Sequence, residues 1–223
     1  MRFRDRVDAG QQLATALTEF VDRPDVIVLA LPRGGVPVAC EVATALSLPM
    51  DVFLVRKLGV PGHPELAMGA IAAGDVQVLS DDLIRDLRIP PVLVQQAVAR
   101  ERVELERRDR LFRGSRPAPD VRNHTVLLVD DGLATGSTME AAIAALRQQN
   151  PARIVVAAPV GASGTCARLS RLADRVVCLL TPHPFEAVGQ WYERFDQTSD
   201  DEVQRLLGSC SSPDHAGRSA QHS

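Results

Sequence analysis

The stretch VLLVDDGLATGST (Val126–Thr138) joins an apolar run, two adjacent carboxylates and a loop of small residues. The run that begins at His124, HTVLLVDD, is typical of a strand buried on both faces of a parallel sheet. Asp130 and Asp131 therefore fall at the carboxyl end of a strand, which is the edge where open α/β sheets bind ligands. The stretch predicts a binding site at that edge.

The loop after the two carboxylates has the composition of a phosphate site. Its backbone N–H groups and hydroxyls can face an anion at the positive end of the helix that follows. Asp130 and Asp131 would repel a phosphate that they faced, but they are good acceptors for the paired hydroxyls of a sugar. A five-carbon sugar phosphate satisfies both halves. The loop residues assigned to this site are Gly132, Ala134, Thr135, Gly136, Ser137 and Thr138.

Three other phosphate-site patterns fit the stretch less well. A nucleotide-binding P-loop needs a lysine beside the Ser/Thr, and Gly136 stands there. A dinucleotide fingerprint needs G-x-G-x-x-G, whereas this loop reads G-x-x-x-G. A phosphatase of the haloacid dehalogenase type needs Asp-x-Asp, and Gly132 holds the second position. An acidic strand end followed by a helix cap would explain a few of these residues but not all thirteen in order.

The flanking sequence alternates strands and helices, which predicts an α/β fold with a mainly parallel sheet flanked by helices. The expected elements are an opening helix with Ala9, Leu13, Leu17 and Phe20; the strands DVIVLAL (Asp25–Leu31) and MDVFLVR (Met50–Arg56) around the turn PRGG and the helix GVPVACEVATALS; an alanine-rich helix ending at Gln149; and the strands ARIVVAAPV and DRVVCLL around a further helix.

The middle of the chain departs from this alternation. LGVPGHPEL (Leu58–Leu66) is rich in glycine and proline, so we expect a mobile loop without regular structure. MGAIAA and VQVLS then indicate a hairpin around Gly74–Asp75. Val92–Phe112 has the pattern of an inserted charged helix, with acidic and basic residues interleaved at i,i+4 spacing. That interleaving favours a solvated or dimer-facing helix over a nucleic-acid surface.

Composition excludes several classes of partner. The chain has 223 residues, 45% hydrophobic and 24% charged, enough for a sizeable core. Its net charge of -3 gives no support to nucleic-acid binding. The charged start MRFRDRVDAG and the lack of an apolar run of about 20 residues support neither a signal peptide nor a membrane span, so we expect a cytoplasmic protein. All 25 basic residues except Lys57 are arginine, which singles out that lysine.

The four cysteines have no C-x-x-C spacing, which argues against a disulfide framework or a zinc site. We interpret Cys40, Cys166 and Cys178 as small core residues. Cys210 falls in the tail GSCSSPDHAGRSAQHS, residues 208–223, which lacks apolar content and which we expect to be disordered.

Val126–Thr138 resembles the ribose-phosphate signature of the type I phosphoribosyltransferase family. ALPRGG (Ala30–Gly35) stands where that family has its diphosphate loop, and VRKLGVPGHPE stands where it has a mobile catalytic loop. The order of the three landmarks extends the resemblance over residues 25–180. It implies one domain over residues 1–207, with a small variable hood that includes residues 181–207.

The resemblance implies transfer of ribose-5-phosphate from 5-phosphoribosyl 1-diphosphate to a nitrogenous, nucleobase-like acceptor, with release of diphosphate. Asp130 and Asp131 would hold the ribose hydroxyls, and Ala134 to Thr138 the 5-phosphate. The residues expected at the diphosphate are Arg33, Gly34, Gly35, Arg56 and Lys57, and those expected to handle a proton are Glu65 ahead of His63. Mg²⁺ would arrive with the substrate, so no protein cage is expected.

The acceptor is not encoded in any pattern that we can name. Phe185, Trp191, Tyr192 and Phe195 crowd into FEAVGQWYERF, either as a stacking face for a planar acceptor or as a segment packed on the sheet. Dimers are common in the family, so a homodimer is possible, but nothing in the sequence proves it. Two alternatives stay open: a regulatory protein of the same fold that binds without turnover, and, less well supported, a sugar-phosphate isomerase or phosphatase.

Overall fold

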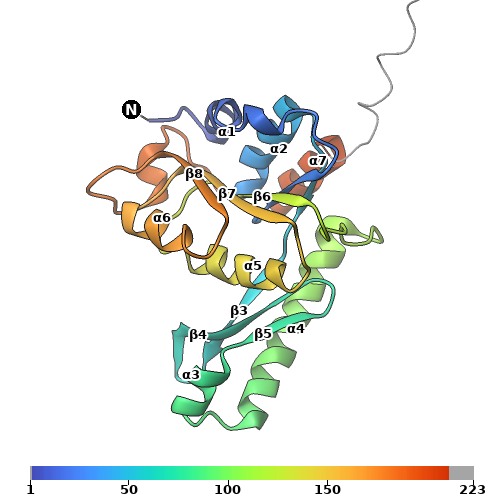
Figure 1. Ribbon diagram of the computed structural model, residues 1–223, viewed down its shortest axis with the longest axis vertical. Helices are drawn as coiled ribbons and strands as arrows, with labels where there is room; N and C mark the ends of the chain where they lie inside the picture. The colour runs from blue at the N-terminus through green and yellow to red at the C-terminus, as the bar shows by residue number, and fades with distance from the viewer. Residues whose placement is uncertain (1, 211–223) are drawn as a thin grey trace, which may run out of the picture.

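The computed structural model describes residues 2–210, with the side chains of Pro64 and Glu65 excepted. Its larger lobe is a five-stranded parallel sheet, which confirms the expected α/β fold (Figure 1). The strands, in spatial order, are β2 (Met50–Val52), β1 (Val26–Ala30), β6 (Thr125–Val129), β7 (Arg153–Val160) and β8 (Arg175–Leu180).

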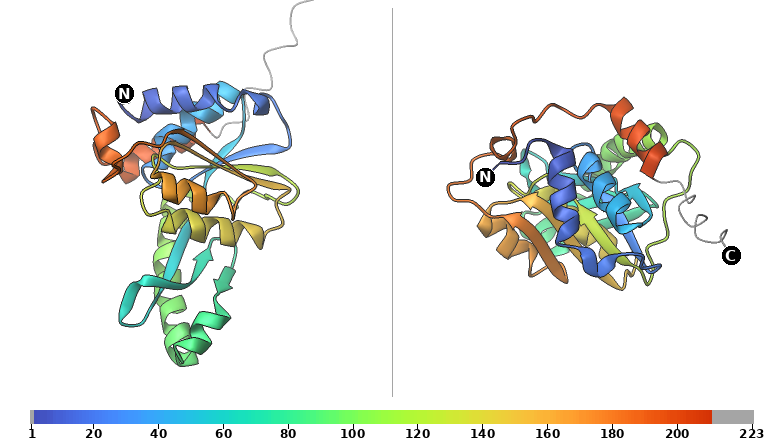
Figure 2. Two further views of the ribbon diagram at one scale, coloured as in Figure 1. Left: turned by 60° about the vertical axis from the view of Figure 1, so that its left-hand side comes forward. Right: turned by 90° about the horizontal axis from the view of Figure 1, so that it is seen from above.

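Helices cover both faces of this sheet (Figures 1 and 2). One face packs against α1 (Arg6–Thr15), α2 (Gly35–Leu46) and α7 (Asp200–Cys210), and the other against α5 (Ser137–Arg147) and α6 (Ser163–Leu169). Alternation along the strands feeds both cores: Val28 faces α2, and its neighbour Leu29 faces α5. Because both faces are covered, the strands are apolar throughout, which is why they stand out in the sequence. Short 3-10 turns occur at Thr18–Phe20 and Val188–Trp191.

The smaller lobe is an antiparallel sheet beside a long helix, and it projects from the larger lobe (Figures 1 and 2). Its elements are β3 (Val55–Val60), β4 (His63–Ala72), β5 (Val76–Leu79), α3 (Asp81–Asp86) and α4 (Pro91–Arg113). The hairpin expected around Gly74–Asp75 joins β4 to β5, and the expected charged helix is α4. Among the described residues, no helix is long and apolar enough to cross a lipid bilayer.

Two expectations about this region were wrong. Met50–Arg56 is not one strand, because Phe53 and Leu54 carry the chain out of the parallel sheet between β2 and β3. Leu58–Leu66 is not an irregular loop either, since it forms the end of β3, a turn at Pro61–Gly62 and the start of β4. Gly62 has φ of +82°, a value suited to glycine, so the glycine and proline mark a tight turn.

A buried arginine attaches α4 to the larger lobe. The Arg113 side chain is 2% exposed and forms ion pairs with Asp51 of β2 and Asp109 of its own helix. It also donates to the backbone oxygen of Val52. The planar guanidinium can satisfy several acceptors at once, which suits it to a buried junction.

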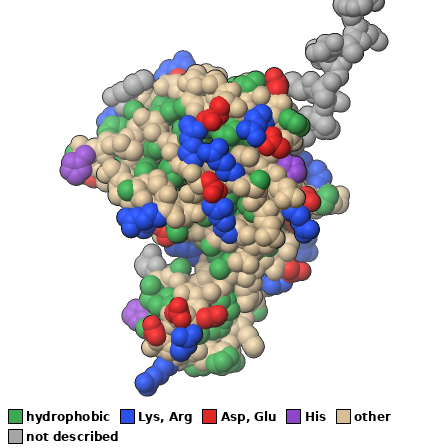
Figure 3. All heavy atoms as spheres, in the orientation of Figure 1, with side chains coloured by type: hydrophobic (Ala, Val, Ile, Leu, Met, Phe, Trp, Pro, Cys, Tyr) green, Lys and Arg blue, Asp and Glu red, His purple; other side chains and the backbone are tan. Residues whose placement is uncertain are grey.

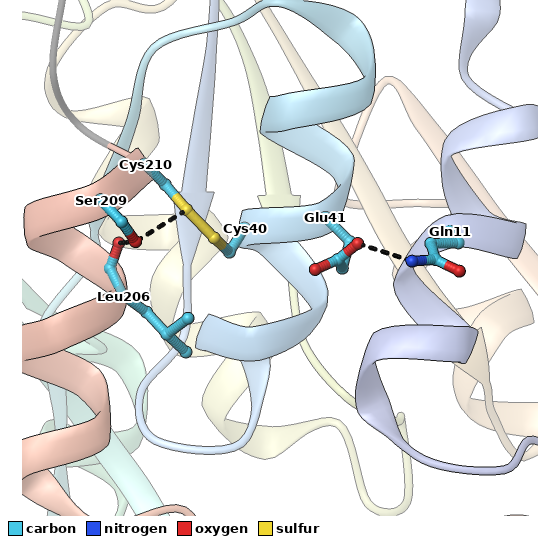
Figure 4. The surroundings of a disulfide bond; sticks show 6 residues. All are labelled: Gln11, Cys40, Glu41, Leu206, Ser209 and Cys210. Carbon is cyan, nitrogen blue, oxygen red and sulfur yellow. Dashed lines mark hydrogen bonds between the residues drawn. A yellow bond between two sulfur atoms is a disulfide. The ribbon is translucent and has the colours of Figure 1, made fainter.

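Cys40 of α2 and Cys210 of α7 form a disulfide (Figure 4), which corrects the interpretation of Cys40 as an unbonded core residue. The two cysteines are 170 residues apart, so no local spacing could have revealed the pair. Cys166 and Cys178 are half-buried and not disulfide-bonded. Residues 208–210 belong to α7, so the part of the expected disordered tail that the structure describes is helical; residues 211–223 lie outside the described part of the chain.

Candidate active site

Two loops meet at the carboxyl edge of the parallel sheet. Ala30 at the end of β1 pairs with Val129 at the end of β6, and the Leu31 N–H donates to Val129 O at 2.9 Å. The chain leaves β1 through residues 31–34 into α2 and leaves β6 through residues 130–136 into α5. The two segments that the sequence predicted for diphosphate and ribose phosphate are therefore neighbours in space.

Gly34 and Gly35 allow these loops to touch. A Cβ on Gly34 would overlap Oδ2 of Asp131, and one on Gly35 would lie 2.7 Å from Val129 O. The sequence interpretation placed these glycines against a diphosphate. In the structure they also let the carboxylate loop pack against the β1 loop.

Asp130 is half-buried, and its Oδ1 accepts the N–H of Asp131 at 2.9 Å. Burial raises the pKa of this carboxyl well above its ordinary value, and the neighbouring Asp131 charge raises it further. Oδ2 receives no side-chain hydrogen bond from the described residues. Asp130 can therefore offer an oxygen to a sugar hydroxyl or to a water bound to a metal ion.

Asp131 is held by a residue that the sequence interpretation missed. Arg6 Nε of α1 donates to Asp131 Oδ2 at 2.8 Å, and both side chains are nearly buried, at 12% and 14% exposed. Burial raises the pKa of the Asp131 carboxyl, and the Arg6 charge opposes that rise. Arg6 also lies 3.9 Å from the centre of the Phe195 ring and donates to Asp196 O. No local pattern marks Arg6, which lies 125 residues from its partner.

The aromatic cluster packs mainly against the N-terminal segment. The Tyr192 hydroxyl donates to Asp131 O at 2.6 Å, and its ring lies 5.6 Å from Phe3 and 4.9 Å from Phe195 between ring centres. Tyr192 is buried, which raises the pKa of its hydroxyl. The contacts of Tyr192 and Phe195 are those of a packed segment, which is one of the two interpretations that the sequence allowed. The segment of residues 181–199 touches the site where the Tyr192 hydroxyl binds the backbone oxygen of Asp131.

The loop before α5 is arranged as an N-terminal cradle. Gly136 caps the helix with φ of +74°, and the first helical hydrogen bond runs from Glu140 N to Gly136 O. The N–H groups before Glu140 thus precede the helical ladder. The hydroxyls of Thr135 and Ser137 lie 3.3 Å apart at the same place. These groups make the loop a candidate site for an anion.

A cleft of about 900 Å³ separates the two lobes next to this cradle. In the space-filling view, the molecule is narrower between the two lobes than within either of them (Figure 3). The cleft brings together Arg56, Lys57 and Thr138, and its far wall includes Arg100 and Glu101 of α4. Arg56 donates to Glu101 Oε2 through both Nε and Nη2, whereas Lys57 has no ion-pair partner among the described residues. Asp130 and Asp131 do not line this cleft.

The remaining predicted residues do not line the cleft in the described part of the structure. Arg33 is half-buried, and its Nη1 lies 3.6 Å from Asp200 Oδ1 of α7. His63 is exposed at the start of β4, outside the cleft lining. Glu65 also lies in β4, and its side chain is outside the described part of the structure. No group of three or more His, Cys, Asp or Glu in the described residues could hold a metal ion.

A strand that ends in paired carboxylates, a small-residue loop that opens a helix, and a parallel sheet flanked by helices match the type I phosphoribosyltransferase fold. Residues 5–193 match the family described as "Phosphoribosyl transferase domain". The chain belongs to this family.

Known relatives extend over most of the chain. It is 47% identical over 205 residues, 92% of its length, to the Mycobacterium tuberculosis protein named "Putative phosphoribosyl transferase Rv0571c". The match covers 46% of that relative, so the chain spans about half the length of the curated relatives it matches.

Among solved structures, the protein TT1426 from Thermus thermophilus superposes with a TM-score of 0.87 at 42% identity, covering 95% of this chain and all of TT1426. A hypoxanthine-guanine phosphoribosyltransferase from Bacillus anthracis superposes with a TM-score of 0.50 at 9% identity, covering 87% of this chain and 92% of that protein. The second similarity shows the shared fold alone.

Proposed function

We propose that this protein is a phosphoribosyltransferase that transfers ribose-5-phosphate from 5-phosphoribosyl 1-diphosphate to a nitrogenous, nucleobase-like acceptor and releases diphosphate. The observation that carries the proposal is that one loop, between β6 and α5, holds both the paired carboxylates and the cradle. The cleft lined by Arg56 and Lys57 reaches the end of this loop at Thr138. Membership of the family supports the same interpretation.

Each segment has a part in the proposed reaction. The cradle from Ala134 to Thr138 would bind the 5-phosphate through backbone N–H groups and hydroxyls. Asp130 would accept a hydrogen bond from a ribose hydroxyl. Arg56 and Lys57 would lie near the departing diphosphate and neutralise the charge that develops on it, while the anomeric carbon takes on oxocarbenium character.

Mg²⁺ fits this arrangement as a companion of the substrate. The ion is commonly held by one or two carboxylates together with substrate phosphates. Asp130, with Oδ2 unused by described side chains, would meet that need from the protein side. The bound ion would supply charge neutralisation on the diphosphate.

The structure qualifies the role expected for Asp131. One of its oxygens already accepts from Arg6, and the carboxylate packs against Gly34. We therefore assign Asp131 first to holding the β1 loop, α1 and the Tyr192 segment in place, and Asp130 to the sugar.

The experiment is an assay of diphosphate release. Purified protein receives Mg²⁺ and 5-phosphoribosyl 1-diphosphate with a panel of nucleobases and other nitrogenous acceptors. Release that depends on one acceptor is the expected result. Binding of 5-phosphoribosyl 1-diphosphate without release for any acceptor would instead favour the regulatory alternative. An Asp130→Asn protein serves as the matched control for contaminating activity.

A further inference from the structure

Helix α6 supplies two side chains to the loop assigned to the 5-phosphate. Thr165 Oγ1 donates to Ala134 O at 2.6 Å, and Arg168 donates through Nη2 to Thr135 O. Two successive backbone oxygens of the cradle are thus bound to the same helix. Neither residue belongs to the motif that marks the site in the sequence.

We propose that Thr165 and Arg168 are positioning residues that hold the cradle in its anion-binding conformation. The inference rests on the proposed function, because it assumes that the cradle receives a phosphate. Neither side chain needs to touch the substrate for this role.

The geometry of the peptide group connects these two contacts to the N–H groups of the cradle. In a trans peptide the C=O and the following N–H point in opposite directions. Among the described residues, only Pro32–Arg33 and His183–Pro184 are cis, so the peptides of this loop are trans. With Ala134 O and Thr135 O turned toward α6, the N–H groups of Thr135 and Gly136 point away from it. The same contacts keep two partially negative oxygens from facing an anion.

Packing fixes the loop against α6 as closely as the hydrogen bonds do. A Cβ on Gly136 would lie 2.6 Å from Cγ2 of Thr165, so a side chain at Gly136 would push the two segments apart. Thr165 is 6% exposed, which leaves its hydroxyl little choice of partner other than Ala134 O. Loss of that hydroxyl would leave a backbone oxygen without its partner.

Arg168 has a second, electrostatic effect. Its Nε donates to Glu140, an acidic residue in the first turn of α5. A carboxylate near the start of that helix would repel a bound phosphate, and the guanidinium neutralises it. One arginine therefore orients the cradle and offsets the acidic charge beside it.

The test uses isothermal calorimetry with ribose-5-phosphate and with inorganic phosphate. Thr165→Val removes the hydroxyl while keeping the shape, and we expect it to raise the Kd for ribose-5-phosphate about fivefold. Thr165→Ser retains the hydroxyl and should bind within about twofold of the wild type. Arg168→Ala should raise the Kd about tenfold or more, and the Kd of Arg168→Lys should lie between those of the wild type and Arg168→Ala.

Arg147 provides a matched control. Like Arg168, it joins a carboxylate to a backbone oxygen, here Asp174 and Leu172 O, but it lies in the last turn of α5, away from the cradle. Arg147→Ala should lower the melting temperature and leave the Kd unchanged. Equal loss of affinity in Arg147→Ala and Arg168→Ala would overturn the inference, because it would show general destabilisation.

The result also separates this inference from the proposed function. Suppose that the wild type binds ribose-5-phosphate clearly and that Thr165→Val and Arg168→Ala bind it equally well. This result would overturn the positioning role and leave the proposed function standing. Absence of binding by the wild type to ribose-5-phosphate and to 5-phosphoribosyl 1-diphosphate would overturn both.

Discussion

At the scale of single residues, two adjacent carboxylates have different environments. Asp130 is half-buried with a strongly raised pKa, whereas Asp131 forms an ion pair with Arg6. The sequence interpretation assigned both to the ribose hydroxyls, because adjacency gives no means of separating them. Substitution of Asp130 therefore tests the sugar site more cleanly than substitution of Asp131.

Asp130→Asn should weaken binding of 5-phosphoribosyl 1-diphosphate by about 1.5 to 3 kcal/mol, the usual range for hydrogen bonds to charged groups. The same change should raise the melting temperature at pH 7, by roughly 2 to 4 °C for each kcal/mol of destabilisation it relieves. Asparagine keeps an oxygen for the Asp131 N–H and removes the desolvated charge. Calorimetry and thermal denaturation check the two effects separately.

The difference in melting temperature between the wild type and Asp130→Asn should depend on pH in a defined direction. The folded-state pKa of Asp130 lies above the ordinary value of 3.8, so the folded protein holds this proton more tightly than the unfolded chain. Stability from the carboxyl is thus present at pH below 3.8 and lost as pH rises through the raised pKa. The melting temperatures of wild type and Asp130→Asn should converge toward about pH 4; a gap that widens there would contradict the assignment.

Lys57 is the second residue that a substitution can test. It lines the cleft with no ion-pair partner among the described residues, beside Arg56, which is paired with Glu101. Lysine is a compact point charge, whereas arginine is a bulkier planar donor. Lys57→Arg should clearly reduce diphosphate release, and Lys57→Ala should reduce it by the order of a hundredfold. Both melting temperatures should stay nearly unchanged, and wild-type turnover in Lys57→Arg would refute the role.

At the scale of elements, α4 and its hairpin form a lobe that packs on α5 and α7 of the larger lobe and is also held by polar contacts. Arg113 joins the end of α4 to β2, and within the lobe Arg56 joins β3 to the middle of α4. Gln204 of α7 adds a hydrogen bond to Leu111 O. The cleft lies between this lobe and the cradle, so these contacts set the position of its far wall.

Arg113→Ala should lower the free energy of unfolding by about 3 to 5 kcal/mol, because it leaves Asp51 nearly buried without its charge partner. Urea denaturation measures this change. Arg107→Ala is the control on the same helix: its pairing with Glu104 is exposed to solvent, so stability should hardly change. Similar losses in the two variants would argue against Arg113 as the attachment point.

The elements also show what the sequence could predict. Buried parallel strands are apolar along their whole length, so β1, β6 and β7 were visible as runs. The run Met50–Arg56 was misleading because two strands of different sheets follow one another with only Phe53 and Leu54 between them. In Leu58–Leu66, glycine and proline marked a two-residue turn, which composition alone does not distinguish from a longer loop.

The residues of the candidate site likewise include some that the sequence could predict and some that it could not. Residues contiguous in the chain, from Asp130 to Thr138, were predicted together because one local pattern contains them. Arg6, Thr165 and Arg168 were missed because their contacts with that stretch join distant parts of the chain and depend on tertiary packing. Cys40 and Cys210 were missed for the same reason.

At the scale of the whole molecule, the cleft lies between the smaller lobe and two points of the larger lobe, Pro32 after β1 and Thr138 at the start of α5. The molecule is narrower between the lobes (Figure 3). The N-terminal helix and residues 181–199 approach Asp131 from the opposite flank. Under the proposed function, the sugar phosphate would bind at the cradle, which lies in the chain between Asp131 and Thr138 of the cleft lining.

The most direct test of the account is a calorimetric titration of 5-phosphoribosyl 1-diphosphate into the protein with Mg²⁺ present. We predict saturable binding at one site per chain, weakened in Asp130→Asn, together with a higher melting temperature of the liganded protein, because a ligand that binds only the folded state stabilises it. No binding heat and no melting shift at millimolar ligand would contradict the central claim.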